Sequence, residues 1–393
     1  MDVVAADWDT LLALQSNPSP FMRHAYLAAM HLSGSAIEAT GWSPHFITLR
    51  TMNGTLTAAA AIYQKGHSYG EYVFDWAWAN AYAQHGLSYY PKAVAAVPFT
   101  PVPGARLMAR SEAARMALLQ AVLGWCERNG MSSLHLLFIS EDEAATCSKA
   151  GLMLRHTVQF HWENVAPTLV ASRAALAFRD FDNFLESLAQ DKRKKIRQER
   201  RKVRDAGVSF RWALGDQIDQ HDWDFFYRCY ERTYLEHGNA PYLNRDFFKR
   251  MALTMAQHWL LFVAEREGRP IATSLIALDA NDSRASGQNH QKNAPTKVAY
   301  GRYWGALERV DCLHFEACYY QPLQWCIANG YQRFEGGAQG EHKMARALLP
   351  VRTTSAHWLA HTGFSDAVAK FLEREDQGIS AYLGELGRRS PFK

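Results

Sequence analysis

The segment Glu335–Lys343, with the sequence Glu-Gly-Gly-Ala-Gln-Gly-Glu-His-Lys, concentrates residues that can do chemistry. Its glycines allow the backbone to approach a ligand closely or to adopt a positive φ angle. Glu341, His342 and Lys343 offer a base, a proton carrier and a cation for an anionic group. Two interpretations remain open from this stretch alone: a binding loop, or a glycine-rich turn whose charged end is solvated and leads into a helix.

The histidines and carboxylates of the same region do not form a tight metal-ligand motif. These residues are His314, Glu316, Glu335, Glu341 and His342. Protein zinc sites usually use ligands at short, characteristic spacings, so no metal is expected. The six cysteines are scattered without a Cys-x-x-Cys pair. We therefore expect buried free thiols rather than a zinc cage or a disulfide framework.

A strongly basic run extends from Asp191 to Lys202. Such a run is usually the solvated face of a helix. The functional alternative is contact with the phosphates of a tRNA, a nucleotide-linked substrate or a membrane surface. In that alternative, the residues expected to make the contact are Arg193, Lys194, Arg197 and Arg201.

The composition is typical of a globular protein. The chain has 393 residues, of which 48% are hydrophobic and 21% are charged, and its net charge is +4. This charge is too small to indicate nucleic-acid binding by itself, and the length favours two domains. The segment Met1–Asp7 is acidic where a signal peptide would be basic, and no apolar run approaches the roughly 18 residues of a membrane span. We therefore expect a cytoplasmic protein without a transmembrane segment.

Helices and strands alternate along the chain. Asn53-Gly54 between two apolar runs predicts a β-hairpin, and Gly268 with Pro270 marks a second hairpin. The expected helices cover about Phe21–Met30, Ser111–Asn129, Glu141–Lys149, Phe181–Arg204, Asp222–His237 and Asn244–His258. The expected strands are His45–Leu49, Thr57–Tyr63, Leu134–Ile139, His156–Trp162, Trp259–Ala264, Ile271–Leu278 and Tyr331–Phe334. The polar segment Asn281–Thr296 is expected to be an exposed loop.

Sequence echoes between the two halves predict an internal duplication. The matched pairs are Trp125–Gly130 with Trp325–Gly330, Tyr69–Tyr72 with Tyr300–Tyr303, and His161-Trp162 with His357-Trp358. The fold class that follows is α/β with mixed sheets, in two related domains. We place these domains at residues 1–170 and 171–393, the second beginning with a basic helical segment at about residues 181–206.

Segments from both halves resemble the FemAB-like N-acyltransferases of bacteria. They are Tyr300–Gly305, His314–Gln321 and Gly337–Lys343 in the second half, and His67–Asp75, Tyr89–Lys92 and Val97–Val102 in the first. The resemblance covers nearly the whole chain. It implies tandem GNAT-like domains and transfer of an acyl or aminoacyl group to an amine. In the Fem peptidyltransferases, which share that architecture, the donor is aminoacyl-tRNA and the acceptor is a nucleotide- or lipid-linked cell-wall peptide.

The chain departs from the acyl-CoA loop of simple GNAT enzymes, which reads Gln/Arg-x-x-Gly-x-Gly/Ala. The nearest segment, Arg302–Leu307, fails at its last position, so acetyl-CoA is not supported as the donor. We expect no permanently bound cofactor, and acyl-CoA, an acyl carrier or aminoacyl-tRNA as co-substrate. The expected partners are a small-molecule or peptide amine acceptor, with tRNA or a carrier protein as candidates for delivering the acyl group. The oligomeric state is not indicated.

Direct acyl transfer requires a neutral amine, a route for its proton and stabilisation of the oxyanion. The expected catalytic residues are Glu316, in an aromatic stretch that would raise its pKa, Glu335 at a strand end, and His342 as the alternative base. For each acid, a structural salt bridge or helix cap is the alternative role. The expected substrate-binding residues are Tyr72, Asp75, Trp76, Arg302, Tyr303, Trp304, Tyr319, Tyr320, Gln339, Glu341, Lys343 and Arg346.

A non-catalytic binding protein of the same fold is the competing hypothesis. Such a protein would use the aromatic residues and the basic helix to recognise an anionic or peptidoglycan-like ligand. Fold and family do not fix the substrate. The two hypotheses therefore have to be distinguished by what the residues of the glycine-rich segment do.

Overall fold

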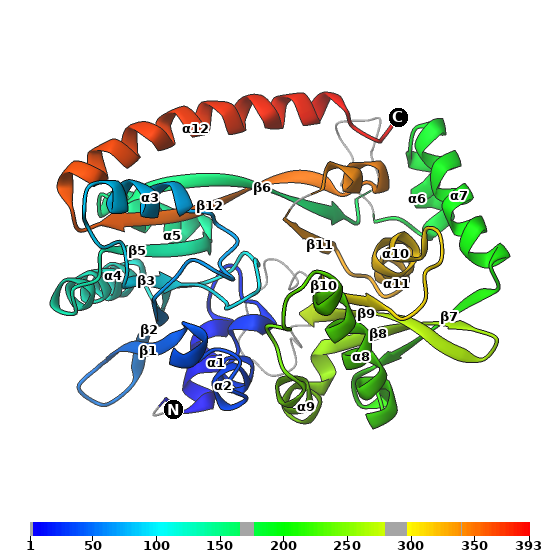
Figure 1. The fold of residues 1–393 in the computed structure, drawn as a ribbon, viewed down its shortest axis with the longest axis horizontal. Helices are drawn as coiled ribbons and strands as arrows, with labels where there is room; N and C mark the ends of the chain where they lie inside the picture. Colours follow the sequence, from blue (N-terminus) through cyan, green and yellow to red (C-terminus); the bar gives the residue numbers. More distant parts are fainter. Residues whose placement is uncertain (1–2, 166–176, 280–296, 339) are drawn as a thin grey trace. The chain divides into compact units, whose positions relative to one another are not determined.

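The computed structural model describes residues 3–165, 177–279, 297–338 and 340–393 (Figure 1). The domain boundary expected after residue 170, the expected loop Asn281–Thr296 and Gln339 lie outside the described residues. The chain divides into two compact units. Unit 1 comprises residues 1–158, 242–247 and 352–384, and unit 2 comprises residues 159–241, 248–351 and 385–393.

Unit 1 contains a mixed sheet. Its strands follow the order β1 (Ser43–Arg50), β2 (Leu56–Lys65), β3 (Lys92–Ala95), β5 (Ser133–Ile139) and β12 (Leu349–Leu359), with β4 (Met108–Ala109) also paired to β2. The expected hairpin is β1 and β2, which are antiparallel across the Asn53-Gly54 turn. β3 and β5 are parallel, so they need a crossover connection, and α4 (Glu112–Arg128) lies within it.

The core of unit 1 forms between β5 and α4. Every residue of β5 is buried, as a strand covered on both faces requires. Leu118, Leu119 and Val122 of α4 pack in the same apolar cluster as Leu134 and Leu136 of β5. Unit 1 also contains α1 (Ala5–Ala13), α2 (His24–Leu32), α3 (Trp76–Gln84), α5 (Glu141–Lys149) and most of α12 (Thr362–Arg388).

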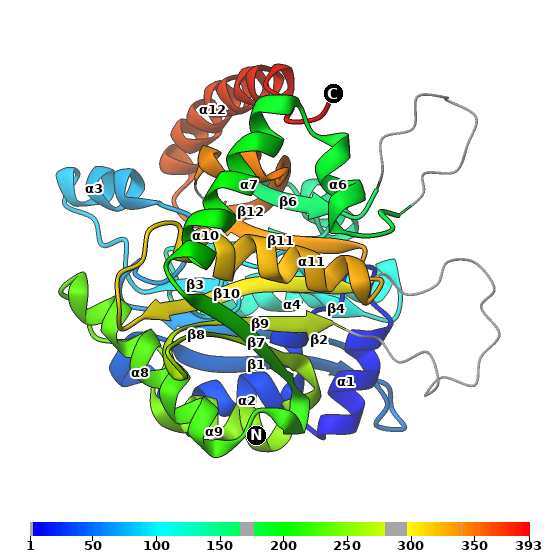
Figure 2. The same ribbon diagram turned by 90° about the vertical axis from the view of Figure 1, so that its right-hand side faces the viewer.

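Unit 2 repeats this plan. Its strands follow the order β11 (Arg333–Ala338), β10 (Val298–Ala306), β9 (Arg269–Asp279), β8 (Trp259–Arg266) and β7 (Val208–Leu214). β8 and β9 form the second expected hairpin, and β10 and β11 are parallel. The predicted α/β class with mixed sheets is therefore confirmed. α8 (Gln220–Glu236) packs against β9 and β10, as Figure 2 shows.

The helix expected over Phe181–Arg204 is two helices, α6 (Phe181–Ser187) and α7 (Gln190–Asp205). They are separated because the chain is extended at Leu188 and Ala189, where it pairs with the C-terminal residues: the Ala189 amide donates to the Pro391 carbonyl at 2.8 Å. α7 buries Ile196, Glu199 and Val203. Most of its basic side chains remain exposed.

The remaining helical segments complete the chain. They are α9 (Arg245–Thr254), α10 (Leu313–Phe315), a π-helical turn at Glu316–Tyr320, α11 (Gln321–Ala328), a 3-10 helix at Glu341–Arg346 and α12 (Thr362–Arg388). The expected N-cap of α9 is present, since Asn244 accepts a hydrogen bond from the Phe247 amide at 3.0 Å. Among the described helices, none has the length and apolar character needed to cross a bilayer.

Each unit completes its sheet with a strand from the other half of the sequence. The chain passes from unit 1 to unit 2 inside β6 (Met153–Glu163), and it returns inside β12. In unit 2, residues 159–163 of β6 pair with β11. In unit 1, residues 354–359 of β12 pair with β5. The strand that follows each parallel pair is therefore exchanged between the two halves.

The C-terminal ends of α4 and α11, whose sequences are similar, have the same geometry. Asn129 and Asn329 each bond the carbonyl of the tryptophan four residues earlier through both the backbone amide and the side chain. The following glycines, Gly130 and Gly330, have φ angles of 63° and 68°, which favour glycine. The Tyr69–Tyr72 echo differs, because this segment lies in the loop after β2, whereas Tyr300–Tyr303 lies in β10.

The strand exchange predicts that the N-terminal half does not fold alone. Residues 1–170 without the rest of the chain would lack the β12 neighbour of β5, leaving buried backbone groups of β5 without partners. We expect no cooperative urea-unfolding transition for this fragment by circular dichroism. The control is the full chain cleaved after residue 170 once folded, which should keep its transition. A cooperative transition in the isolated fragment would contradict the exchange.

Candidate functional site

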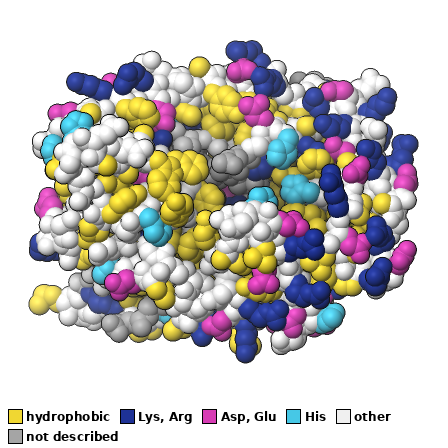
Figure 3. Space-filling model, viewed as in Figure 1, with side chains coloured by type: hydrophobic (Ala, Val, Ile, Leu, Met, Phe, Trp, Pro, Cys, Tyr) yellow, Lys and Arg dark blue, Asp and Glu magenta, His cyan; other side chains and the backbone are white. Residues whose placement is uncertain are grey.

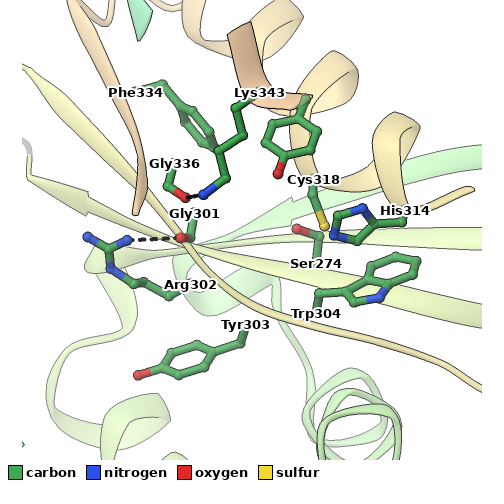
Figure 4. A pocket seen from close by; sticks show the side chains of 11 residues that line it. Ser274, Gly301, Arg302, Tyr303, Trp304, His314, Cys318, Phe334, Gly336 and Lys343 are labelled. Atoms are coloured by element: carbon green, nitrogen blue, oxygen red, sulfur yellow. Dashed lines mark hydrogen bonds between the residues drawn. The ribbon is translucent and has the colours of Figure 1, made fainter. Parts of the chain in front are cut away.

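A cavity of about 220 Å³ lies in unit 2 between the sheet and the helical segment that begins at Leu313 (Figure 4). Side chains from β9, β10, β11, this helical segment and the 3-10 helix converge on it. The lining residues are Ser274, Gly301, Arg302, Tyr303, Trp304, His314, Cys318, Tyr319, Phe334, Gly336 and Lys343. Five of them, Arg302, Tyr303, Trp304, Tyr319 and Lys343, are predicted substrate-binding residues.

The cavity lies where β10 and β11 stop pairing. The parallel ladder between them ends with Tyr300 opposite Glu335. Immediately beyond, the register of β10 against β9 shifts by one residue at Arg302. A β-bulge of this kind bends a strand and redirects a side chain, and such bulges are frequent next to active sites.

Two glycines are required by close packing at this point. A Cβ atom on Gly301 would lie 2.7 Å from the Phe334 ring. One on Gly336 would overlap the Leu348 side chain and lie 3.1 Å from the Phe160 carbonyl oxygen. Gly336 belongs to the segment Glu335–Lys343, and here its close neighbours are groups of the protein itself. The expected approach of this segment to a ligand stays a prediction.

Lys343 is a buried lysine at the cavity wall. It projects from the 3-10 helix, and its Nζ donates hydrogen bonds to the carbonyl oxygens of Gly336 at 2.7 Å and Gly337 at 3.3 Å. Only 6% of its surface is exposed. Burial, followed by the positive charge of Arg302, lowers the pKa of Lys343 to about 8. Lys343 is therefore predominantly a cation at neutral pH, close to its titration point.

Glu335 is fully buried beside two arginines. Its carboxylate lies 3.7 Å from Arg302 Nη2 and 3.2 Å from Arg333 Nη2. His161 of β6 lies opposite Glu335 in the antiparallel ladder. Burial lowers the pKa of His161 to about 4, with Arg333, Arg302 and Lys343 acting in the same direction. This histidine is neutral at pH 7, so the positive charge around Glu335 comes from Arg302, Arg333 and Lys343.

Three polar residues of the cavity were not predicted as site residues: Ser274, His314 and Cys318. Figure 4 shows the Cys318 sulfur directed toward Ser274 and His314. Burial raises the pKa of Cys318 to about 12, so its thiol is protonated at neutral pH. Exclusion of water by neighbouring atoms, followed by electrostatic interactions with His342, Arg346 and Lys343, lowers the pKa of His314 to about 4, although part of this residue is exposed.

The π-helical turn carries Cys318 and Tyr319 to this wall. π-helical turns inside helices are frequent at functional sites, but the sequence does not mark them. The sequence marks His314, together with Glu316, only as a member of a candidate metal site, which is not expected to form. Among the described residues, no group of His, Cys, Asp and Glu side chains is arranged to hold a metal ion.

Glu316 faces away from this cavity. Its carboxylate accepts hydrogen bonds from Arg200 Nε at 3.1 and 3.2 Å and from Gln321 Nε2 at 2.8 Å. It lines a second concave region, beside α7. This geometry matches the structural salt bridge that the sequence left open as an alternative to catalysis.

Arg346 and Tyr320 are engaged by Glu199 of α7. Arg346 Nη2 lies 2.9 Å from both carboxylate oxygens of Glu199, and the Tyr320 hydroxyl donates to the same carboxylate. The Arg346 guanidinium also lies over the Phe315 ring, 3.6 Å from its centre. These contacts hold the 3-10 helix of Lys343 against α7, and they give Arg346 a positioning role.

His342 and Glu341 lie at the outer side of the 3-10 helix. The His342 ring is 6.3 Å from the Tyr319 ring, which lines the cavity. Burial, followed by Arg346 and Lys343, lowers the pKa of His342. Glu341 forms an exposed ion pair with Arg389 at 3.0 Å. His342 is thus a neutral imidazole near the cavity, whereas Glu341 is partnered at the surface.

The remaining predicted residues lie elsewhere. Asp75 is buried in unit 1, where burial alone would raise its pKa and the adjacent Lys92 ammonium lowers it well below the usual range. Tyr72 has a φ angle of 61°, and Trp76 is partly exposed beside Tyr69. On α7, Arg197 and Arg201 line the concave region that contains Glu316, whereas Arg193 and Lys194 line neither region.

Comparison with known proteins places the chain in context. A family model named FemAB-like, described as peptidoglycan biosynthesis/recognition, matches residues 1–393. No curated protein sequence matches the chain significantly. Among solved structures, FemX has a TM-score of 0.55 at 10% identity, covering 94% of this chain and 99% of its own.

Two further structures share the fold. They are L-PGS from Bacillus licheniformis and the C-terminal domain of a putative lysylphosphatidylglycerol synthetase from Agrobacterium fabrum. The first has a TM-score of 0.50 at 9% identity, covering 94% of this chain and 97% of its own. The second has a TM-score of 0.50 at 11% identity, covering 93% and 94%. These likenesses concern the fold alone, and they agree with the predicted α/β fold of two related units.

The lowered pKa of Lys343 predicts how its contribution to stability changes with pH. The folded pKa of about 8 lies below the ordinary value of 10.5, so between these values the unfolded chain binds a proton that the folded chain does not. The free energy of unfolding of the wild type should therefore rise with pH relative to Lys343→Met from pH 8 to pH 10. Urea unfolding at pH 7 and pH 10 measures the difference.

Lys249→Met is the matched control, because Lys249 is an exposed lysine of α9. Its difference from the wild type should stay flat across the same pH range. A flat difference for Lys343→Met as well would mean that Lys343 titrates normally and is not held in a shielded environment.

Proposed function

The chain belongs to the FemAB-like family over residues 1–393, and from this premise we propose that it is an N-acyltransferase. It would move an acyl or aminoacyl group from an activated donor, an acyl-thioester or an aminoacyl-tRNA, to an amine. The description of the family supports a cell-wall precursor as acceptor, with another amino compound as the alternative. The observation that carries the proposal is the buried Lys343 ammonium at the wall of a cavity of about 220 Å³.

The proposed reaction forms one amide bond. A neutral amine attacks the donor carbonyl carbon, and the oxyanion that develops lies near the Lys343 ammonium, which stabilises it. Collapse of the tetrahedral intermediate breaks the C–S or C–O bond to the donor. The amine proton leaves to a base. The leaving thiolate or ribose alkoxide takes a proton from a general acid or solvent and departs as the thiol or hydroxyl.

His342 and Glu335 are the proposed proton acceptors. His342 has a lowered pKa, so it is neutral at pH 7 and free to accept a proton. Glu335 lies deeper, beside Arg302, and would act through a water molecule. Glu316 is the least supported of the three predicted catalytic residues, because its carboxylate already accepts hydrogen bonds from Arg200 and Gln321. His314, neutral and at the cavity wall, is a further candidate.

The cavity residues would bind the reacting groups. Arg302, Tyr303, Trp304 and Tyr319 line it and present aromatic faces and one cation. Four residues of α7, Arg193, Lys194, Arg197 and Arg201, are proposed to contact the phosphates of a tRNA donor or a nucleotide-linked substrate. Acyl-CoA and a carrier protein remain alternatives for the donor, with no permanently bound cofactor.

A second candidate function is recognition without catalysis, favoured by the word "recognition" in the family description. The two functions differ in turnover. Native mass spectrometry of protein purified from its own host would identify a retained donor, acyl group or precursor. Incubation with aminoacyl-tRNA or acyl-CoA pools and a peptidoglycan-precursor pool would then reveal a new amide. A retained precursor with no amide from any donor would favour recognition.

Lys343→Ala should lower kcat for amide formation by about a hundred- to a thousandfold, the usual cost of losing one oxyanion-stabilising group. The precursor affinity should change much less, because the oxyanion exists only in the transition state. Lys249→Ala, an exposed lysine, is the control and should retain wild-type kcat. Equal kcat in all three proteins would exclude the proposed role of Lys343.

The pH profile gives an independent test. The wild-type rate should fall above about pH 8 as Lys343 loses its proton, even though more of the amine acceptor becomes neutral. Lys343→Arg should lose this alkaline limb, since a guanidinium keeps its charge. A wild-type rate that continues to rise to pH 10 would show that the charge of Lys343 is not needed.

A further inference from the structure

A second concave region of about 520 Å³ lies in unit 2 beside α7, and we call it the α7 pocket. It shares no lining residue with the cavity of Lys343. Figure 3 shows Lys and Arg side chains gathered over the part of unit 2 that carries α7. The lining residues are Asp182, Leu185, Arg197, Arg200, Arg201, Val203, Arg204, Val208, Ser209, Phe210, Glu316 and Gln321.

Four arginines of α7 face this pocket. Arg197, Arg201 and Arg204 are spaced four and three residues apart, which places them on one helical face, with Arg200 beside them. They extend over about 10 Å of the helix. Neither Arg197 nor Arg201 forms an ion pair with any other residue that the structure describes, and Arg204 has only a 3.8 Å contact with Asp205. The pocket therefore presents guanidinium groups that are available to a ligand.

Arg200 is already fixed in place. Glu316, which is 3% exposed, accepts from its Nε at 3.1 Å, and Gln324 accepts from its Nη2 at 2.9 Å. The guanidinium lies over the Phe181 ring at 4.8 Å from the centre. Because folding already orders this long side chain, a ligand that binds it loses little further side-chain entropy. Glu316 is in this respect a positioning residue of the α7 pocket.

Among the lining residues that the structure describes, two carry carboxylates. Glu316 is committed to Arg200, and Asp182 is exposed at the pocket edge. The lining also contains apolar side chains, including those of Val203, Val208 and Phe210. The net charge of the wall is positive, and its apolar part can cover the uncharged portion of a ligand. Arginine forks match the oxygen geometry of phosphates, often with two hydrogen bonds at once.

We propose that the α7 pocket binds a ligand that carries two linked phosphates. A single phosphate is too small to reach arginines spread over two helical turns, whereas a diphosphate presents oxygens to several of them. Ser209 and Gln321 add neutral polar groups to the wall. This pocket shares no lining residue with the cavity of Lys343. The inference rests on the phosphate contact proposed above for α7, but it does not require acyl transfer.

Inorganic pyrophosphate is the probe, measured by isothermal titration calorimetry with the full chain at low salt. We expect saturable binding with one site. Arg197→Gln and Arg201→Gln should each weaken it by about tenfold, as expected for loss of hydrogen bonds to a charged group. Inorganic phosphate should bind more weakly than pyrophosphate. ADP should compete with pyrophosphate, because its base can lie on the apolar wall.

Lys195→Gln is the matched control, since Lys195 is an exposed cation of α7 that does not line the pocket. It should bind pyrophosphate within about twofold of the wild type, because distant exposed charges are screened. Thermal unfolding checks that all variants are folded.

Three outcomes would overturn the proposal: no saturable pyrophosphate binding, equal weakening by all three substitutions, or binding of a short single-stranded RNA that pyrophosphate does not displace. Amide formation by the variants is a separate readout, so loss of phosphate binding and failure of the proposed acyl transfer can be told apart.

Discussion

The end of pairing between β10 and β11 is the constraint on which the candidate site depends. Beyond Tyr300 and Glu335 the parallel ladder stops, and backbone groups that it would have used need other partners. Lys343 supplies them, donating to the carbonyl oxygens of Gly336 and Gly337. This contact holds the ammonium group inside the protein, where burial, followed by the positive charge of Arg302, lowers its pKa. The end of the strand pairing, the glycine carbonyls and the burial of Lys343 therefore depend on one another.

The sequence indicated one wall of the cavity and not the other. The density of glycine and charge in Glu335–Lys343 predicted a close backbone approach, and the α/β class with two hairpins followed from hydrophobic patterns. Ser274, His314 and Cys318 carry no local signal, because β9 and a π-helical turn bring them together only in the folded chain. The role of Glu316 was equally hidden, since its partner Arg200 is 116 residues away in the sequence. Catalytic assignments therefore stay predictions, while the fold is confirmed.

The two related units differ in how each accommodates a buried lysine. In unit 1, Lys92 is also a buried lysine, but its ammonium lies 2.8 Å from Glu71 and contacts Asp75 and Ser68. Burying such a group is costly unless every charge is matched, and here two carboxylates match it. In unit 2, Lys343 projects from the 3-10 helix and donates to the carbonyl oxygens of Gly336 and Gly337. The two units thus show how one plan can produce either a closed polar network or a lysine at a cavity wall.

The exchange of β6 and β12 has a consequence for synthesis on the ribosome. β5 of unit 1 is complete early, but its neighbour β12 ends only at Leu359. At bacterial rates of translation, the nascent chain would wait about 10 to 40 s between the end of β6 and the emergence of β12. During that time the edge of β5 is a row of unpaired backbone groups that another chain could bind. Because of this topology, the exposed edge of β5 would need protection during synthesis, for example by a chaperone.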